Sequence, residues 1–151
     1  MRRTFAVTVL LLVASASAGL EQQPSKVSSH LPSKDIEKFV VEKLDLSTFR
    51  NSFGPRREPG MRSFADFGLR PTSVSKDSVE FKEADWTYTV KILGRRDYNN
   101  DGIEDLAIRF TDRSLTGSYQ SESQLLLTRF SNDSQLIAIA YELDVASPRT
   151  P

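Results

Sequence analysis

Large hydrophobic residues alternate with small or polar ones through much of the second half of the chain. This period of two runs from Trp86 to Leu93 and again from Leu106 to Phe110, and it is typical of β-strands with one buried face. Segments rich in β-forming residues predict three more strands, at Val79–Lys82, Leu125–Phe130 and Gln135–Glu142. The linking segments are short, so we predict an antiparallel β-meander of about four to five strands.

A different hydrophobic period, close to that of a helix, precedes the strands. Ile36, Phe39, Val40 and Leu44 recur at spacings that place them on one face of a helix. Ser33 is a suitable residue to cap the start of that helix. A sheet with one apolar face needs a cover. We therefore predict an α+β fold in which this N-terminal amphipathic helix packs on one face of the meander.

The first residues have the three parts of a bacterial signal peptide. A basic start, Met1–Arg3, precedes an apolar run from Phe5 to Ala14, and Ala16–Ala18 supplies a small-x-small cleavage pattern. The alternative is an uncleaved anchor, but the run is shorter than the roughly 20 residues of a membrane span. We predict a periplasmic or extracellular protein with no membrane span after signal cleavage. The predicted organisation is a signal peptide (residues 1–18), a flexible linker (19–32), a single α+β domain (33–144) and a disordered tail (145–151).

The composition excludes several kinds of chemistry. The 151 residues include 20 basic and 20 acidic side chains, so the net charge does not favour a nucleic-acid partner, which usually requires a basic domain. The absence of cysteine excludes disulfides, thiolate metal sites and a cysteine nucleophile. The single histidine, His30, lies in the polar linker, so neither a Ser-His-Asp triad nor a histidine-rich zinc site is expected.

The strongest chemical signal lies between the two most regular predicted strands, in residues 97–105. Oxygen-bearing side chains occupy alternate positions at Asp97, Asn99 and Asp101, and Gly102 then permits a sharp turn before Asp105. Calcium prefers about six to eight oxygen ligands, drawn from carboxylates, amides and backbone carbonyls. Carboxylates that converge without a cation would repel one another. The spacing therefore predicts a calcium-binding loop.

This segment resembles the Asp-x-Asn-x-Asp-Gly-x-x-Asp calcium loop of FG-GAP-type and VCBS-type repeats, which lies between strands. It differs from a true EF-hand because its twelfth position is Ile108, where an EF-hand has a bidentate glutamate. The motif occurs once, so the resemblance does not imply a propeller. A plain hairpin turn without metal is the alternative. The resemblance implies that the calcium ligands are the side chains of Asp97, Asn99, Asp101 and Asp105 and the backbone carbonyl of Ile103.

These features favour a secreted or periplasmic domain without catalytic activity, in which a structural calcium loop supports the binding of an envelope protein or glycan. One alternative is a binder of anionic surfaces, lipid or peptidoglycan, through the loop from Arg50 to Arg70. Arg56, Arg57 and Arg62 are the other arginines of that loop. A second alternative is a carboxylate-dependent hydrolase that would use Glu80, Glu83 and Asp85.

Overall fold

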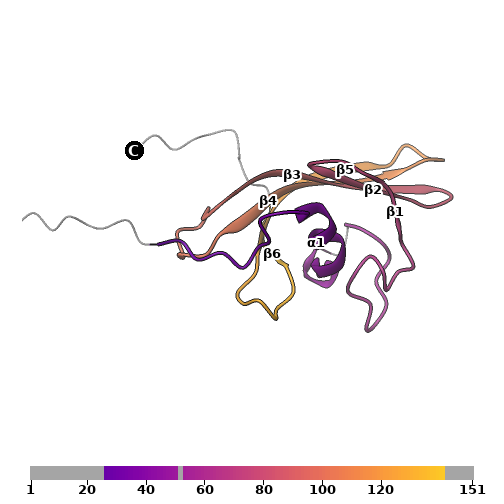
Figure 1. Ribbon diagram of the computed structural model, residues 1–151. Coiled ribbons are helices and arrows are strands. Elements are labelled where there is room, and N and C mark those ends of the chain that lie inside the picture. Colours follow the sequence, from indigo (N-terminus) through magenta and orange to yellow (C-terminus); the bar gives the residue numbers. More distant parts are fainter. Residues whose placement is uncertain (1–25, 51–52, 142–151) are drawn as a thin grey trace, which may run out of the picture.

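In the computed structural model, which describes residues 26–50 and 53–141, the strands form one antiparallel sheet with a short helix across one side (Figure 1). The strands follow one another in chain order, so each pairs with its neighbours in sequence. The described elements are α1 (Ile36–Lys43), the 3-10 helix η1 (Leu46–Thr48), β1 (Pro71–Val74), β2 (Ser78–Lys82), β3 (Trp86–Arg96), β4 (Asp105–Ser114), β5 (Gln120–Thr128) and β6 (Ile137–Tyr141). The predicted signal peptide, the first part of the predicted linker and the predicted tail lie outside the described residues.

The predicted fold class is wrong, although the antiparallel meander is present. The described chain is mostly sheet, with six strands where the hydrophobic pattern predicts four to five. The additional strand is β1, which pairs with β2 although all four of its residues are exposed and it begins at Pro71. An exposed edge strand needs no hydrophobic alternation, so the pattern gives no signal for it.

The predicted N-terminal amphipathic helix is also corrected, because the helix is shorter than predicted and is not N-terminal. It does not lie at the N-terminus, and α1 has only eight residues. Asp35 rather than Ser33 precedes its first turn, in the left-handed region (φ 52°) and without a capping hydrogen bond from its side chain. Leu44 has already left the helix in an extended conformation. Among the residues that the structure describes, no helix is long and apolar enough to cross a bilayer.

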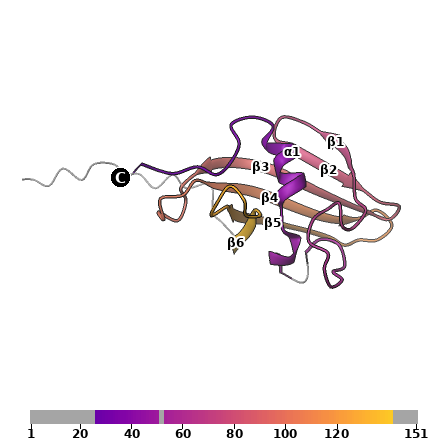
Figure 2. The ribbon, with the colours of Figure 1, turned by 60° about the horizontal axis from the view of Figure 1, so that its bottom comes forward.

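Residues outside α1 supply most of the cover for the sheet. Within the helix only Val40 is buried. A helix of about two turns is also too short to reach across six strands. The rest of the cover comes from η1 and the loop that follows it, which lie on the same face as α1 (Figure 2). Phe64 of this loop stacks on Phe81 of β2 with ring centroids 3.9 Å apart, and Phe49 meets Phe110 of β4 edge to face at 5.1 Å.

The central hairpin of β3 and β4 fixes where the loops lie. These are the longest strands, with 11 and 10 residues, and they pair from Trp86 opposite Ser114 to Arg96 opposite Asp105. The loop of residues 97–104 therefore closes one end of the sheet. The β2–β3 turn and the β4–β5 turn lie at the opposite end. Functional side chains in the β3–β4 loop and those in the other two turns therefore lie at opposite ends of the same hairpin.

We predict that Phe110→Ala lowers the free energy of unfolding by about 3–5 kcal/mol, because it removes a fully buried ring and leaves a cavity beside Phe49 and Tyr88. Phe130→Ala is the matched control, since the Phe130 side chain is exposed and its loss should change the stability by less than about 0.5 kcal/mol. Urea unfolding followed by circular dichroism measures both. Equal losses for the two variants would contradict the assignment of the core.

Candidate functional site

The loop of residues 97–104 is curled by hydrogen bonds from its own amides to its side-chain oxygens. The Asp97 carboxylate accepts from the Asp101 amide at 3.1 Å and from the Gly102 amide at 2.9 Å. Asn99 Oδ1 also accepts from the Asp101 amide at 3.1 Å, and Asp101 Oδ1 accepts from the Ile103 amide at 2.8 Å. The oxygen-bearing side chains at the first, third and fifth positions are thus gathered on the inside of one turn.

Two residues with positive φ make this curl possible. Gly102 has φ 83° and Asn100 has φ 61°, the left-handed region that glycine enters freely and asparagine tolerates best among the other residues. Their placement agrees with the turn that the sequence predicts at Gly102. A β-branched residue at either position would strain the loop.

Asp105 differs from the other predicted ligands because it is completely buried at the start of β4. Its Oδ2 accepts a hydrogen bond from the Tyr98 amide at 3.1 Å. Its Oδ1 is buried and has no hydrogen-bond partner in the described structure, and neither has the buried hydroxyl of Thr128 on β5. A buried carboxylate oxygen without a partner costs free energy. This oxygen is therefore the feature of the loop that requires explanation.

The electrostatics of Asp105 tie it to the rest of the loop. Burial raises the pKa of the Asp105 carboxyl, and the carboxylates of Asp101 and Asp97 raise this pKa further. The Tyr98 amide and the nearby Thr128 hydroxyl lower the pKa in part, although the Thr128 hydroxyl does not form a hydrogen bond of normal geometry. The ionised carboxylate is thus short of positive charge, and a cation inside the turn would supply it.

The residues present fit a calcium ion in the kind of donor they offer. All are oxygen donors, one carboxylate oxygen is buried and unpartnered, and a backbone carbonyl is at hand. The bridge that pairs Ile103 with Ser28 uses Gly102 O and the Glu104 amide, so this bridge leaves the Ile103 carbonyl unused. Within the described ranges no group of three histidine, cysteine, aspartate or glutamate side chains is arranged to hold a metal. Binding would therefore need the Asn99 and Ile103 oxygens as well, and calcium stays a prediction.

Residues of the predicted linker dock against this loop. The Ser28 amide donates to Gly102 O at 2.8 Å, and the Glu104 amide donates to Ser28 O at 2.7 Å. The Glu104 side chain accepts from the Ser29 hydroxyl and forms an ion pair with Arg95 at 2.8 Å. Burial opposes ionisation of Glu104, but hydrogen bonds from Arg95 and Ser29 outweigh it, so the Glu104 pKa is lowered. In Figure 1 this segment lies alongside the β3–β4 loop at the left end of the sheet.

A second concave feature lies at the other end of the hairpin, where a cavity of about 580 Å³ opens between the β2–β3 turn and the loop before β1. Its apolar lining includes Phe67, Trp86 and Tyr88. Glu83 and Asp85 of the turn line it as well. Two of the acids predicted for a hydrolase are thus brought to one cavity. The third, Glu80, alternates with the core-facing Val79 and Phe81 and so lies on the opposite face of β2.

The cavity is held in shape by a buried acid that the sequence analysis does not identify. Asp112 of β4 is 2% exposed; its carboxylate accepts from the Trp86 indole nitrogen and, at 2.9 Å, from the Gly54 amide. Burial raises the pKa of Asp112, against the effect of these two hydrogen bonds. A signal for this residue exists in the sequence, because Asp112 continues the core-facing alternation of Ile108 and Phe110.

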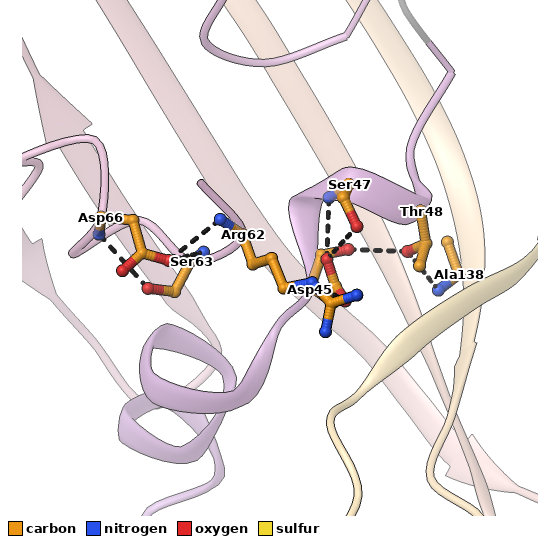
Figure 3. Close-up of polar contacts among 7 residues, drawn as sticks. All are labelled: Asp45, Ser47, Thr48, Arg62, Ser63, Asp66 and Ala138. Atoms are coloured by element: carbon orange, nitrogen blue, oxygen red, sulfur yellow. Dashed lines mark hydrogen bonds and ion pairs between the residues drawn. The ribbon is translucent and has the colours of Figure 1, made fainter. Parts of the chain in front are cut away.

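The arginine-rich loop is used partly for structure (Figure 3). Arg62 lies 3.6 Å from the buried Asp45 carboxylate, and its carbonyl accepts from the Leu46 amide at 2.7 Å. The Asp66 carboxylate accepts from the backbone amides of Ser63 and Arg62, and these bonds lower the Asp66 pKa. Arginines that hold the loop in place in this way are less available for an anionic surface.

The other arginines of this loop divide in the same way. Arg57 donates to the Arg50 carbonyl at 2.6 Å, within the loop itself. Arg56 and Arg70 are exposed, and Arg56 lines the cavity. Several arginines of this loop are thus engaged within the protein, which weakens the case for an anionic surface as the partner.

Comparisons with protein-family models, with curated proteins and with solved structures found no match. Function is therefore inferred from the chemistry of the two ends of the hairpin.

We predict that Glu104→Gln, measured with chelator, lowers the free energy of unfolding by about 1 kcal/mol at neutral pH, because it weakens the charged contacts with Arg95 and Ser29. The lowered pKa means that the contribution of Glu104 is present above the ordinary glutamate pKa of 4.5 and is lost as the pH falls below it. The stability difference between wild type and variant should therefore shrink in acid. Urea unfolding across pH measures it, and a difference that grows in acid would contradict the ion pair.

Proposed function

We propose that this protein is an exported, non-catalytic β-domain whose β3–β4 loop binds a structural calcium ion and whose surface binds a glycan or protein of the cell envelope. The observation that supports the calcium site is the unpartnered, buried Oδ1 of Asp105, in a loop that carries the full Asp-x-Asn-x-Asp-Gly-x-x-Asp pattern. A hairpin turn alone needs neither the pattern nor a buried carboxylate.

Calcium suits these donors better than other common metals. Nitrogen and sulfur ligands favour zinc and copper, whereas the loop offers carboxylates, one side-chain amide and one backbone carbonyl. Magnesium needs a near-ideal octahedron and keeps much of its water, whereas calcium accepts irregular sets of about six to eight oxygens. The short, flexible side chains of Asp97, Asn99 and Asp101, two of them exposed, can move to complete such a set.

The role of the ion would be to stabilise the fold. It would neutralise the carboxylates that close the longest hairpin and would hold the Ile103 region against which Ser28 docks. Extracellular calcium modules bind with a Kd of about 0.1–1 mM. With free calcium at about ten times a Kd of 0.1 mM, the gain in stability is about 1.4 kcal/mol. This gain is substantial for a cysteine-free domain with thin helical cover.

The non-catalytic assignment is supported by the environment of the candidate catalytic acids. Glu83 and Asp85 are both exposed at the mouth of the cavity, whereas a catalytic acid needs an environment that keeps it protonated. The export of the protein is inferred from the signal-peptide pattern of residues 1–18. Of the two partner classes, the cavity and its aromatic lining favour a glycan.

We predict that calcium raises the melting temperature of the wild-type protein above its value in chelator, and that Asp101→Ala removes almost all of this shift because it deletes a ligand. Asp105→Asn should also lose the shift. In chelator, Asp105→Asn should melt at or above the wild-type temperature, because the variant no longer buries an uncompensated charge. Differential scanning fluorimetry with and without calcium measures all three proteins.

Asp133→Ala is the control, since Asp133 is an exposed acid in the turn between β5 and β6; it should keep the full calcium shift. Isothermal titration calorimetry should give one calcium per chain for wild type and for this control. If calcium changed the melting temperature of none of the four proteins, only a metal-free hairpin would remain and the proposal would be refuted.

A further inference from the structure

We infer that the cavity at the β2–β3 end of the sheet is a carbohydrate-binding site, in which a sugar ring lies against Trp86 and its hydroxyl groups bond to Arg56, Glu83 and Asp85. This inference deepens the proposed glycan-binding role and rests on it. It concerns the end of β3 remote from the calcium loop, so the two sites can be tested separately.

The size and the lining of the cavity suit a sugar. Its volume of about 580 Å³ lies in the range of about 300–1,000 Å³ that is common for small-molecule sites. Aromatic rings of Phe67, Trp86 and Tyr88 line it together with Pro55. The electron-rich face of an aromatic ring attracts weakly positive C–H groups. Sugar rings present such groups on their faces and hydroxyls on their edges, and this mixed surface matches the lining.

The cavity carries charged groups of both signs in its lining. Glu83 and Asp85 are hydrogen-bond acceptors when ionised, and Arg56 is a donor. A ligand with a strong charge of either sign would meet a like charge on one side of the cavity. A hydroxyl both donates and accepts, so a neutral polyol can satisfy all three groups. The two acids and one base of this edge therefore argue against an anionic lipid, and they suit a carbohydrate, whose hydroxyls can pair with groups of either sign.

The aromatic surface of the cavity is held in place by contacts within the protein. Asp112 bonds the Trp86 indole and the Gly54 amide at once, so one buried carboxylate ties the aromatic surface to the loop that carries Arg56. Tyr119 of the β4–β5 turn packs on Trp86 with ring centroids 5.4 Å apart. A site whose aromatic surface is already fixed loses less entropy when a ligand binds.

The chain offers an unusually direct measurement, because Trp86 is its single tryptophan. With excitation selective for tryptophan, which leaves the four tyrosines unexcited, a change in emission on adding a sugar reports on the surroundings of Trp86. We would titrate the full mature chain, with calcium in excess, with tetramers of β-linked glucose and of β-linked N-acetylglucosamine, and separately with lysine amide and with anionic vesicles. We expect a saturable change in Trp86 emission with at least one tetramer.

Variants at the edge of the cavity test the named contacts. Asp85→Asn and Arg56→Ala should each weaken sugar binding about tenfold, the loss expected for one hydrogen bond to a charged group. Glu80→Gln and Arg70→Ala are the matched controls, because Glu80 lies on the opposite face of β2 and Arg70 is exposed outside the cavity lining. Both controls should bind sugar as wild type does and keep the calcium-induced melting shift.

The outcomes separate this inference from the proposal on which it rests. Emission that does not change with either tetramer, or that changes only with lysine amide or vesicles, would overturn the carbohydrate site. The calcium shift in melting would remain unaffected by that failure. Chromatography after incubation should return the tetramers intact; if they were cleaved, the non-catalytic role would fail while the cavity remained the sugar site. Equal weakening by the Glu80 and Asp85 variants would also overturn the assigned contacts.

Discussion

The pairing of β3 with β4 is the interaction on which the rest of the structure depends. It is the longest pairing in the sheet, and every other described element either extends it sideways or covers one of its faces. Its register runs from Trp86 opposite Ser114 to Arg96 opposite Asp105, so the pairing reaches both ends of the hairpin. The β3–β4 loop and the β2–β3 turn thus occupy defined positions although neither has regular structure.

β4 places one buried carboxylate near each end of this pairing. Asp105 begins the strand and is fully buried, and Asp112 lies seven residues later with 2% exposure. Burial raises the pKa of both. Asp112 is compensated within the described protein, since each of its oxygens accepts a hydrogen bond from a partly buried donor. Asp105 accepts a hydrogen bond of normal geometry on one oxygen only, although the Thr128 hydroxyl lies near and lowers its pKa. The two carboxylates are similarly buried but unequally hydrogen-bonded. This difference supports an ion at Asp105 more strongly than the acidic residues of the loop do by themselves.

The sequence predicts the parts of the fold that depend on local periodicity. The alternation in β3 and β4 identifies both strands, and the glycine and asparagine of the loop identify its turn. The edge strand β1 is missed because its exposed residues carry no pattern. The docking of Ser28 on the loop is missed because a polar segment bonded through its backbone looks the same in sequence as a free one. Only tertiary contacts distinguish the two.

The same limit applies to the candidate sites. The calcium ligands that the resemblance implies lie within nine consecutive residues, so the sequence displays the candidate loop directly. The cavity joins Arg56, Phe67 and the turn at Glu83, and these come from segments whose proximity only the meander establishes. Glu80 shows the difference, because it lies close to Glu83 in sequence but on the opposite face of the strand from the cavity. Residues close together in one strand therefore share a face, and can share a site, only when they are an even number of positions apart.

The separation of the two ends limits how calcium could influence ligand binding. The seven residue-to-residue steps from Asp105 to Asp112 span about 23 Å along the strand, which is more than twice the Debye length of about 8–10 Å at physiological ionic strength. The charge of a bound ion would therefore have little direct effect on Glu83 or Asp85. Any influence has to pass through the stability of the hairpin that both ends share. Calcium would then set the fraction of folded molecules, while each folded molecule would bind its ligand with unchanged affinity.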